Sequence, residues 1–237
     1  MIDKVDKQIK SDDPFINLVI TRKRKLYKFA HFDSFKNAFT FSRGDKQYSL
    51  EQAINQWFTT DKPRILEIAA GNAQFSLELA RQNPKLNFMA ADIKSDRLYT
   101  SAKQALSEGV TNIAFVRINM KELCHAFNPD SFAKIWLTFP DPFARKRSVR
   151  RRLTHPDFLK LYDKLLTKDG CLNFKTDSRD LFLWSLEQFV SDNWQIKQLS
   201  FDLHDSDLPA DYKIMTHYEQ RFVEQDIPIN YGTFIKN

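Results

Sequence analysis

The sequence predicts an α/β fold, a doubly wound and mostly parallel sheet with helices on both of its faces. From residue 64 onward, short apolar runs alternate with amphipathic stretches, which is the pattern of successive strand–helix units. Several of the helical stretches also carry capping or terminating residues at their ends. The chain has 237 residues, 42% of them hydrophobic, which is enough to build one sizeable core.

The expected elements follow one another at regular spacing. A helix is expected over residues 50–58, before the regular part begins. The expected strands are residues 64–68, 86–92, 113–119, 133–139, 171–176, 194–203 and 227–235. The other expected helices are residues 75–81, 95–107, 156–166, 177–191 and 216–224.

Single residues mark several of the helix ends. Ser95 is expected to cap one helix at its start, and Gly109 is expected just past its end. Pro156 opens the next helix, and Gly170 follows its end. Asp177 is expected to cap the helix after that, to present a carboxylate to a site at the strand ends, or to do both.

Residues 1–49 differ from the rest, because they combine a basic run with many aromatic residues. We expect them to form a basic, partly flexible arm ahead of one domain over residues 50–237. The N-terminus is polar, so secretion is not expected, and no apolar run approaches about 18 residues, so no membrane span is expected. We therefore expect a cytoplasmic protein. With only two cysteines, a disulfide framework is excluded. A monomer and a homodimer both remain open.

Positive charge is concentrated in two segments. Residues 22–28 hold five Lys or Arg, and residues 145–152, called the basic collar below, hold six, with no acid in either. Outside them, 25 basic residues face 30 acidic ones. An acidic body with two basic patches indicates that a polyanion binds at specific places. The alternative for each patch is a charge run that is merely solvated.

The first strand-to-helix turn favours a charged nucleoside over a dinucleotide. A dinucleotide site would need three glycines there, and this turn offers only Gly71. Glu67, at the strand end, would repel a diphosphate, and Asp92 ends the next strand where an acid can grip ribose hydroxyls. S-adenosylmethionine carries a sulfonium and an amino group but no phosphate, so a methyltransferase site is favoured. A solvated strand-end acid is the alternative.

Two further features lie at the same edge of the expected sheet. Asn119, after the third strand, is a candidate partner for the adenine amino group or simply a turn residue. The fourth strand runs into a loop in which Asp141 stands between Pro140 and Pro142. Proline fixes the backbone, so this loop is expected to hold Asp141 rigidly where the methyl group would be delivered.

The collar and its surroundings carry a family resemblance. The run FPDPF-ARKRSVRRR over residues 139–152 resembles the FPDPW-PKKRH-x-KRR block of the tRNA (guanine-N7-)-methyltransferases. The similarity continues in FKTD at residues 174–177 and IMTHYE at residues 214–219, and it covers about residues 64–229. The resemblance implies a Rossmann-like class I methyltransferase that transfers the methyl group of S-adenosylmethionine to N7 of a guanine in the variable loop of tRNA.

The resemblance also implies roles for particular residues, with Asp141 as the catalytic one. Donor contacts would be made by Glu67, Gly71, Asp92, Asn119 and Asp141. Substrate contacts would be made by Arg145, Asp177, Thr216, His217, Tyr218 and Glu219. Contacts to the RNA backbone would be made by Arg147, Arg150, Arg151 and Arg152.

The chain departs from the family pattern at several of these places. Ala69 and Ala73 stand where the family has glycines, and their Cβ atoms could crowd the methionine end of the donor or shift the helix. Asp92 stands where Glu is common, Asn119 where Asp is common, and Phe143 where the family has Trp. We expect these departures to affect the affinity for the donor more than the type of reaction.

Two rival functions remain. One is a methyltransferase acting on another nucleic-acid nitrogen, and the other is a tRNA-binding relative that is catalytically weak or inactive. No metal is expected, because methyl transfer to N7 asks for none and the five histidines show no ligand spacing.

Overall fold

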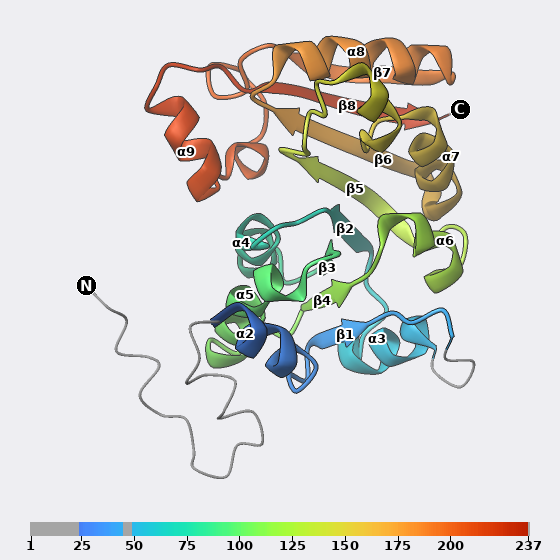
Figure 1. Ribbon diagram of the computed structural model, residues 1–237, viewed down its shortest axis with the longest axis vertical. Coiled ribbons are helices and arrows are strands. Elements are labelled where there is room, and N and C mark those ends of the chain that lie inside the picture. The colour runs from blue at the N-terminus through green and yellow to red at the C-terminus, as the bar shows by residue number, and fades with distance from the viewer. Residues whose placement is uncertain (1–23, 45–48, 237) are drawn as a thin grey trace.

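The computed structural model describes residues 24–44 and 49–236, and these form one eight-stranded sheet with helices on both faces (Figure 1). The prediction of a doubly wound, mostly parallel sheet is confirmed. The strands are β1 Ala38–Thr40, β2 Arg64–Ile68, β3 Asn87–Asp92, β4 Ile113–Arg117, β5 Phe132–Thr138, β6 Leu166–Thr176, β7 Trp194–Ser200 and β8 Asn230–Lys236. The α-helices are α2 Arg24–Phe32, α3 Leu50–Phe58, α4 Gln74–Gln82, α5 Ser95–Ser107, α6 Leu123–Ala126, α7 Pro156–Leu165, α8 Arg179–Ser191 and α9 His217–Val223. Short 3-10 helices are η2 Met120–Glu122, η3 Lys146–Arg151 and η4 Ala210–Lys213.

The strand order is β1-β4-β3-β2-β5-β6-β8-β7, and only β8 runs antiparallel to its neighbours. From the central strand β2 the chain first builds outward through β3 and β4, and then returns to the other side with β5 and β6. The point between β2 and β5 is therefore the topological switch, where ligands bind beyond the carboxyl ends of the strands. The last strand, β8, fills the place between β6 and β7 (Figure 1).

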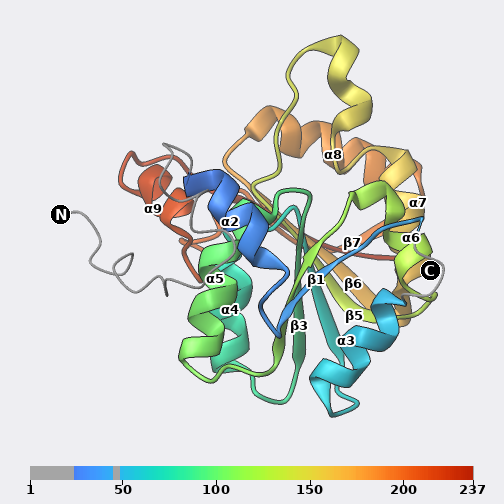
Figure 2. The ribbon, with the colours of Figure 1, turned by 60° about the horizontal axis from the view of Figure 1, so that its bottom comes forward.

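The central strands are buried on both faces, which explains their continuous apolar runs. Ile65 of β2 packs with α4 and α5, and the next residue, Leu66, packs with the opposite cluster that includes α3, α7 and α8. Figure 2 shows α4 and α5 on one side of the sheet and α3, α6 and α7 on the other. The two layers hold the carboxyl ends of β2, β3 and β5 in a fixed arrangement.

The helix-end predictions had mixed outcomes. Gly109 is confirmed as the residue that ends α5, with φ of 71°, and the N–H of Val110 bonds back to the Ala105 carbonyl at 2.9 Å. Pro156 is confirmed in the first turn of α7. The prediction that Ser95 caps α5 was wrong, because the N-cap is Lys94 and Ser95 is already helical and buried. Gly170 does not end α7, because Leu166 turns extended and enters β6 directly.

Asp177 was also wrongly predicted as a cap. The N-cap of α8 is Ser178, whose hydroxyl accepts the N–H of Leu181 at 3.2 Å. Serine and aspartate cap equally well, so two adjacent candidates could not be ordered from the sequence. The carboxylate of Asp177 is thereby left for another use.

Part of the segment expected to be an arm belongs to the sheet. β1 pairs in parallel with β4, Ala38 opposite Phe115, and α2 packs along α5 (Figures 1 and 2). Phe32, in α2, is fully buried, which shows why this aromatic stretch folds with the rest. Residues 38–40 therefore add a strand to the sheet, while residues 1–23 and 45–48 lie outside the described part. Among the described residues, no helix has the length and apolar character to cross a membrane.

Candidate active site

The loop between β2 and α4 winds in an unusual way, with every second residue left-handed. Ala69, Gly71 and Ala73 have φ of 55°, 58° and 57°. The turn closes through the N–H of Ala73, which bonds to the Ala70 carbonyl at 2.8 Å. A left-handed residue with a Cβ costs about 1 kcal/mol or more, so Ala69 and Ala73 are strained where glycine would not be.

This strain predicts that Ala69→Gly stabilises the protein by about 1 kcal/mol in the free energy of unfolding. The matched control is Ala70→Gly, because Ala70 is adjacent and buried but has no left-handed backbone, so glycine there should destabilise. Urea unfolding of both variants measures the difference. Equal effects at the two positions would contradict the strain.

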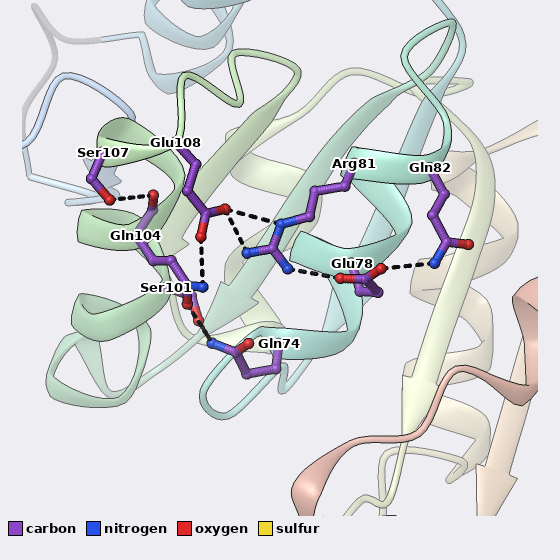
Figure 3. A network of polar contacts seen from close by, with 8 residues as sticks. All are labelled: Gln74, Glu78, Arg81, Gln82, Ser101, Gln104, Ser107 and Glu108. Atoms are coloured by element: carbon purple, nitrogen blue, oxygen red, sulfur yellow. Dashed lines mark hydrogen bonds and ion pairs between the residues drawn. The ribbon is translucent and has the colours of Figure 1, made fainter.

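Polar contacts join α4 to α5 beside the loop that connects β2 to α4 (Figure 3). Arg81 of α4 bridges Glu78 at 2.7 Å and Glu108 at 2.6 Å, and its hydrogen bond lowers the pKa of the Glu108 carboxyl. The Gln74 amide donates to Ser101 at 2.7 Å, and the Ser101 hydroxyl donates to the Asn72 carbonyl oxygen. The loop is therefore held by α5 as well as by its own turn.

Glu67 lies at the end of β2, where it was predicted, but its carboxylate is deeply buried. It accepts hydrogen bonds from the hydroxyls of Ser76 and Thr138. Burial raises the pKa of Glu67, whereas the two hydroxyls and the charge of Lys175 act to lower it. Glu67 therefore joins β2, α4 and β5 beneath the site.

Two adjoining pockets open at the carboxyl ends of the strands. The larger, of about 610 Å³, is lined by Lys28, Glu67, Ala69, Ala70, Gly71, Asn72, Phe75, Asp96, Arg97, Thr100, Thr138, Phe139, Asp141, Thr216 and Tyr218. The smaller, of about 400 Å³, is lined among others by Asp92, Asn119, Met120, Pro140, Asp141, Phe143, Arg150 and Arg151. Four residues, Ala69, Arg97, Phe139 and Asp141, line both, so Asp141 stands where the pockets meet.

Asp92 and Asn119 lie together in the smaller pocket. The two carboxylate oxygens of Asp92 accept the N–H groups of Gly71 at 2.9 Å and Lys94 at 2.8 Å. A carboxylate oxygen can accept a second hydrogen bond, so both keep capacity for a hydroxyl in the pocket. The Asn119 side chain accepts the N–H of Lys121 at 3.1 Å as the N-cap of η2, which is the turn role that the sequence left open beside the adenine contact.

Asp141 and Tyr218 both line the larger pocket, whereas Asp177 lines neither pocket. Burial raises the pKa of the Tyr218 phenol, and so do the charges of Asp177 and Asp141. Burial also raises the pKa of the half-buried Asp177. The Tyr218 ring packs on Phe139 at 5.8 Å between centroids and on Phe222 at 4.9 Å.

Glu219, expected to touch substrate, lies instead in the interior. Its side chain has no exposed surface and pairs with Lys175, which is equally buried, at 2.7 Å. Sequence reasoning passed over Lys175, although a lysine inside a central strand is the signal that could have found it. Thr216 caps α9 and lines the larger pocket, while the side chain of His217 lies outside the described part.

The basic collar divides into two groups. Arg145, Arg147, Arg150 and Arg151 are exposed, and the last two line the smaller pocket. Arg151 lies over the Phe143 ring at 4.4 Å. Arg152, predicted to bind RNA backbone, is buried: its guanidinium donates to the Pro142 carbonyl at 2.9 Å and lies 4.5 Å from the Trp184 ring. In this structure Arg152 supports the loop that carries Asp141.

Replacing Arg152 with alanine is expected to lower the free energy of unfolding by about 3 kcal/mol, because the Pro142 carbonyl and the Trp184 ring lose their partner. Arg150→Ala, at an exposed neighbour, should change it by less than about 0.5 kcal/mol. Thermal and urea unfolding compare the two. An unchanged free energy of unfolding for Arg152→Ala would contradict the role of Arg152 as a support of the loop.

Within the described ranges, no group of three or more His, Cys, Asp or Glu side chains could hold a metal ion. The pockets are surrounded by carboxylates and aromatic rings, and exposed arginines lie beside them. This set suits a cationic small molecule next to a polyanion.

Comparison with known proteins agrees with this geometry. A family model described as "Putative methyltransferase" matches residues 61–230. A tRNA (guanine-N(7)-)-methyltransferase of Christiangramia forsetii is 33% identical over 90% of this chain and 97% of its own length. Another of that name, from Lachnoclostridium phytofermentans, is 38% identical over 76% of this chain and 85% of its own. The crystal structure of the 16S rRNA methyltransferase KamB shares the fold, with a TM-score of 0.60 and 12% identity over 81% of this chain and 96% of that one.

Proposed function

The chain belongs to the family of the tRNA (guanine-N7-)-methyltransferases, and from that premise we propose that it transfers the methyl group of S-adenosylmethionine to N7 of a guanine in the variable loop of tRNA. The observation that carries the proposal is the place of Asp141. It lines both pockets, so a group bound in one meets a group bound in the other beside its carboxylate.

The donor residues fit S-adenosylmethionine. Asp92 keeps acceptor capacity for the two ribose hydroxyls, and Asn119 shares its pocket at the position for adenine. Negative charge at Asp92 and Asp141 favours a cationic donor over a phosphate-bearing one. When bound, the donor supplies a methyl group on a sulfonium, which is an electrophile without help from a metal. The left-handed loop at Ala69 and Gly71 bounds the methionine end.

The acceptor atom determines what the protein must do. Guanine N7 has an in-plane lone pair and carries no proton, so no general base is required. As the methyl group arrives, positive charge develops on the guanine ring. Asp141 and Asp177 accept hydrogen bonds from the N1–H and amino edge and stabilise that charge, which is electrostatic catalysis by fixed groups. Tyr218 lines the larger pocket together with Asp141 and completes the rim.

The exposed arginines of the collar hold the RNA beside this rim. Arg145 approaches the substrate guanine, and Arg147, Arg150 and Arg151 pair with backbone phosphates. Phe143, which lies under Arg151, offers a ring on which an unstacked base can lie. Sequence-specific RNA recognition favours unpaired bases, and a variable-loop guanine meets that requirement.

The test is methyl transfer from labelled S-adenosylmethionine to two tRNA transcripts that differ only in the variable-loop guanine, which is adenine in the control. The product is mapped by reductive strand scission at 7-methylguanosine. Scission at that one guanine, and none in the control, is expected. Transfer to both transcripts would indicate another nitrogen, and tRNA binding without transfer would indicate an inactive relative.

A further inference from the structure

Lys175 places an ammonium group in the interior of the sheet. Its side chain has no exposed surface, and Nζ donates to Oε2 of Glu219 at 2.7 Å and to the Ile214 carbonyl oxygen at 3.0 Å. Burial lowers the pKa of Lys175, while the charges of Glu219 and Glu67 raise it. A buried lysine is costly unless its partners are fixed, so these contacts define its position.

Both hydrogen bonds of Lys175 end in one segment, residues 214–219, which carries the pocket residues Thr216 and Tyr218. Glu219 also starts α9, because its carboxylate accepts the N–H of Thr216 at 3.3 Å and its own N–H donates to the Thr216 hydroxyl at 3.0 Å. The His204 ring lies 3.1 Å from the other oxygen of Glu219. The orientation of Tyr218 thus depends on the buried pair.

Lys175 also lies close to α4 and to the loop that follows β5. Nζ lies 4.4 Å from the centre of the Phe75 ring and 5.6 Å from that of Phe139, and its charge acts on Glu67. Phe139 has φ of 49° and opens the loop that leads to Asp141. One ammonium group therefore contacts the elements that carry both walls of the pocket.

We propose that Lys175 is a positioning residue for methyl transfer: it fixes the distance between the wall that carries Tyr218 and the loop that carries Asp141. Lys175 itself touches neither donor nor guanine. The proposal rests on the proposed function and adds how the two halves are held in register. Because the reaction is a displacement along one line, a shift of about 1 Å between the halves is enough to cost about 100-fold in rate.

Two variants separate the parts of the contact. Lys175→Met keeps a flexible chain of similar volume and removes the charge. Glu219→Gln removes the partner charge and keeps the cap of α9, because glutamine serves equally in the capping box. Each is expected to lower the rate at saturating donor and tRNA about 10- to 100-fold, while the Kd for tRNA changes less than about threefold because the collar is untouched.

The double variant and a matched control decide between positioning and general support. Lys175→Met with Glu219→Gln should be no slower than the slower single variant, because neither charge is then left unpaired and both act through one contact. The control, Lys236→Met, removes a lysine at the end of β8 that pairs with Asp192 at 3.2 Å. It should lower the melting temperature and leave the rate at saturation unchanged.

Three results would overturn the proposal. In the first, Lys175→Met lowers the melting temperature and leaves the rate at saturation unchanged. In the second, the rate loss of the double variant equals the product of the losses of Lys175→Met and Glu219→Gln. In the third, Lys175→Met weakens the Kd for tRNA and leaves the rate at saturation unchanged. A wild-type chain that transfers methyl to another tRNA guanine would refute the proposed acceptor but leave the Lys175 comparison valid on that guanine. A wild-type chain that transfers none would refute the function and the positioning role together.

Discussion

Asp141→Asn is expected to slow methyl transfer at saturating donor and tRNA about 100- to 1,000-fold, which is the usual cost of removing one preorganised electrostatic contact in a closed site. Asparagine keeps the size of the side chain and loses the charge that, in the proposed mechanism, stabilises the cationic guanine ring. The loop geometry should persist, because Arg152 and the flanking prolines fix it independently. Single-turnover transfer with labelled donor measures the rate.

Binding separates this role from a structural one. The Kd for tRNA should stay within about threefold of wild type, because phosphate contacts by the collar supply most of the affinity. Asp157→Asn is the control, since it removes an exposed carboxylate at the start of α7. A collapse of tRNA affinity with an intact rate at saturation would show that Asp141 serves binding instead.

The second large effect concerns the collar. Arg147→Ala combined with Arg150→Ala is expected to weaken tRNA binding about 10- to 100-fold at physiological salt, since both exposed arginines are proposed to pair with backbone phosphates. The slope of log affinity against log salt should fall by about 1 per arginine. Filter binding at several salt concentrations measures both quantities.

A control with the same change in net charge comes from the amino ends of the strands, opposite the pockets. Lys85 precedes β3 and Lys168 lies near the start of β6, and both are exposed. Their double replacement by alanine should leave the salt slope unchanged. An equal loss of affinity in both double variants would mean that total charge, not the collar, attracts the tRNA.

The strand ends were the part of the site that the sequence could predict. Glu67 and Asp92 lie at the ends of β2 and β3, and Asp141 follows β5; parallel strands that are neighbours bring their carboxyl ends to one edge. The sequence pattern therefore predicts their convergence without any knowledge of side-chain contacts. The switch point between β2 and β5 confirms it.

What the sequence could not predict is which of several similar neighbours faces inward. Within the collar, Arg151 and Arg152 are chemically identical, and only the position of Trp184 on α8 decides that Arg152 is the buried one. Asp177 and Ser178 are equivalent as caps until the path of β6 fixes the first turn of α8. β1 has only three residues and little periodicity of its own, so its pairing with β4 depends on the rest of the fold.

The position of β8 has a consequence for biosynthesis. β8 lies between β6 and β7, and among the described residues it is the only sheet neighbour of β7. Until residues 230–236 have been synthesised, β7 therefore has no strand to pair with, and β6 is unpaired on that side. The donor half, residues 64–141, can assemble earlier from parallel units that are already complete. The nascent chain is therefore expected to acquire its donor pocket before its acceptor wall, and premature termination before residue 230 should yield a half-formed sheet that is prone to proteolysis.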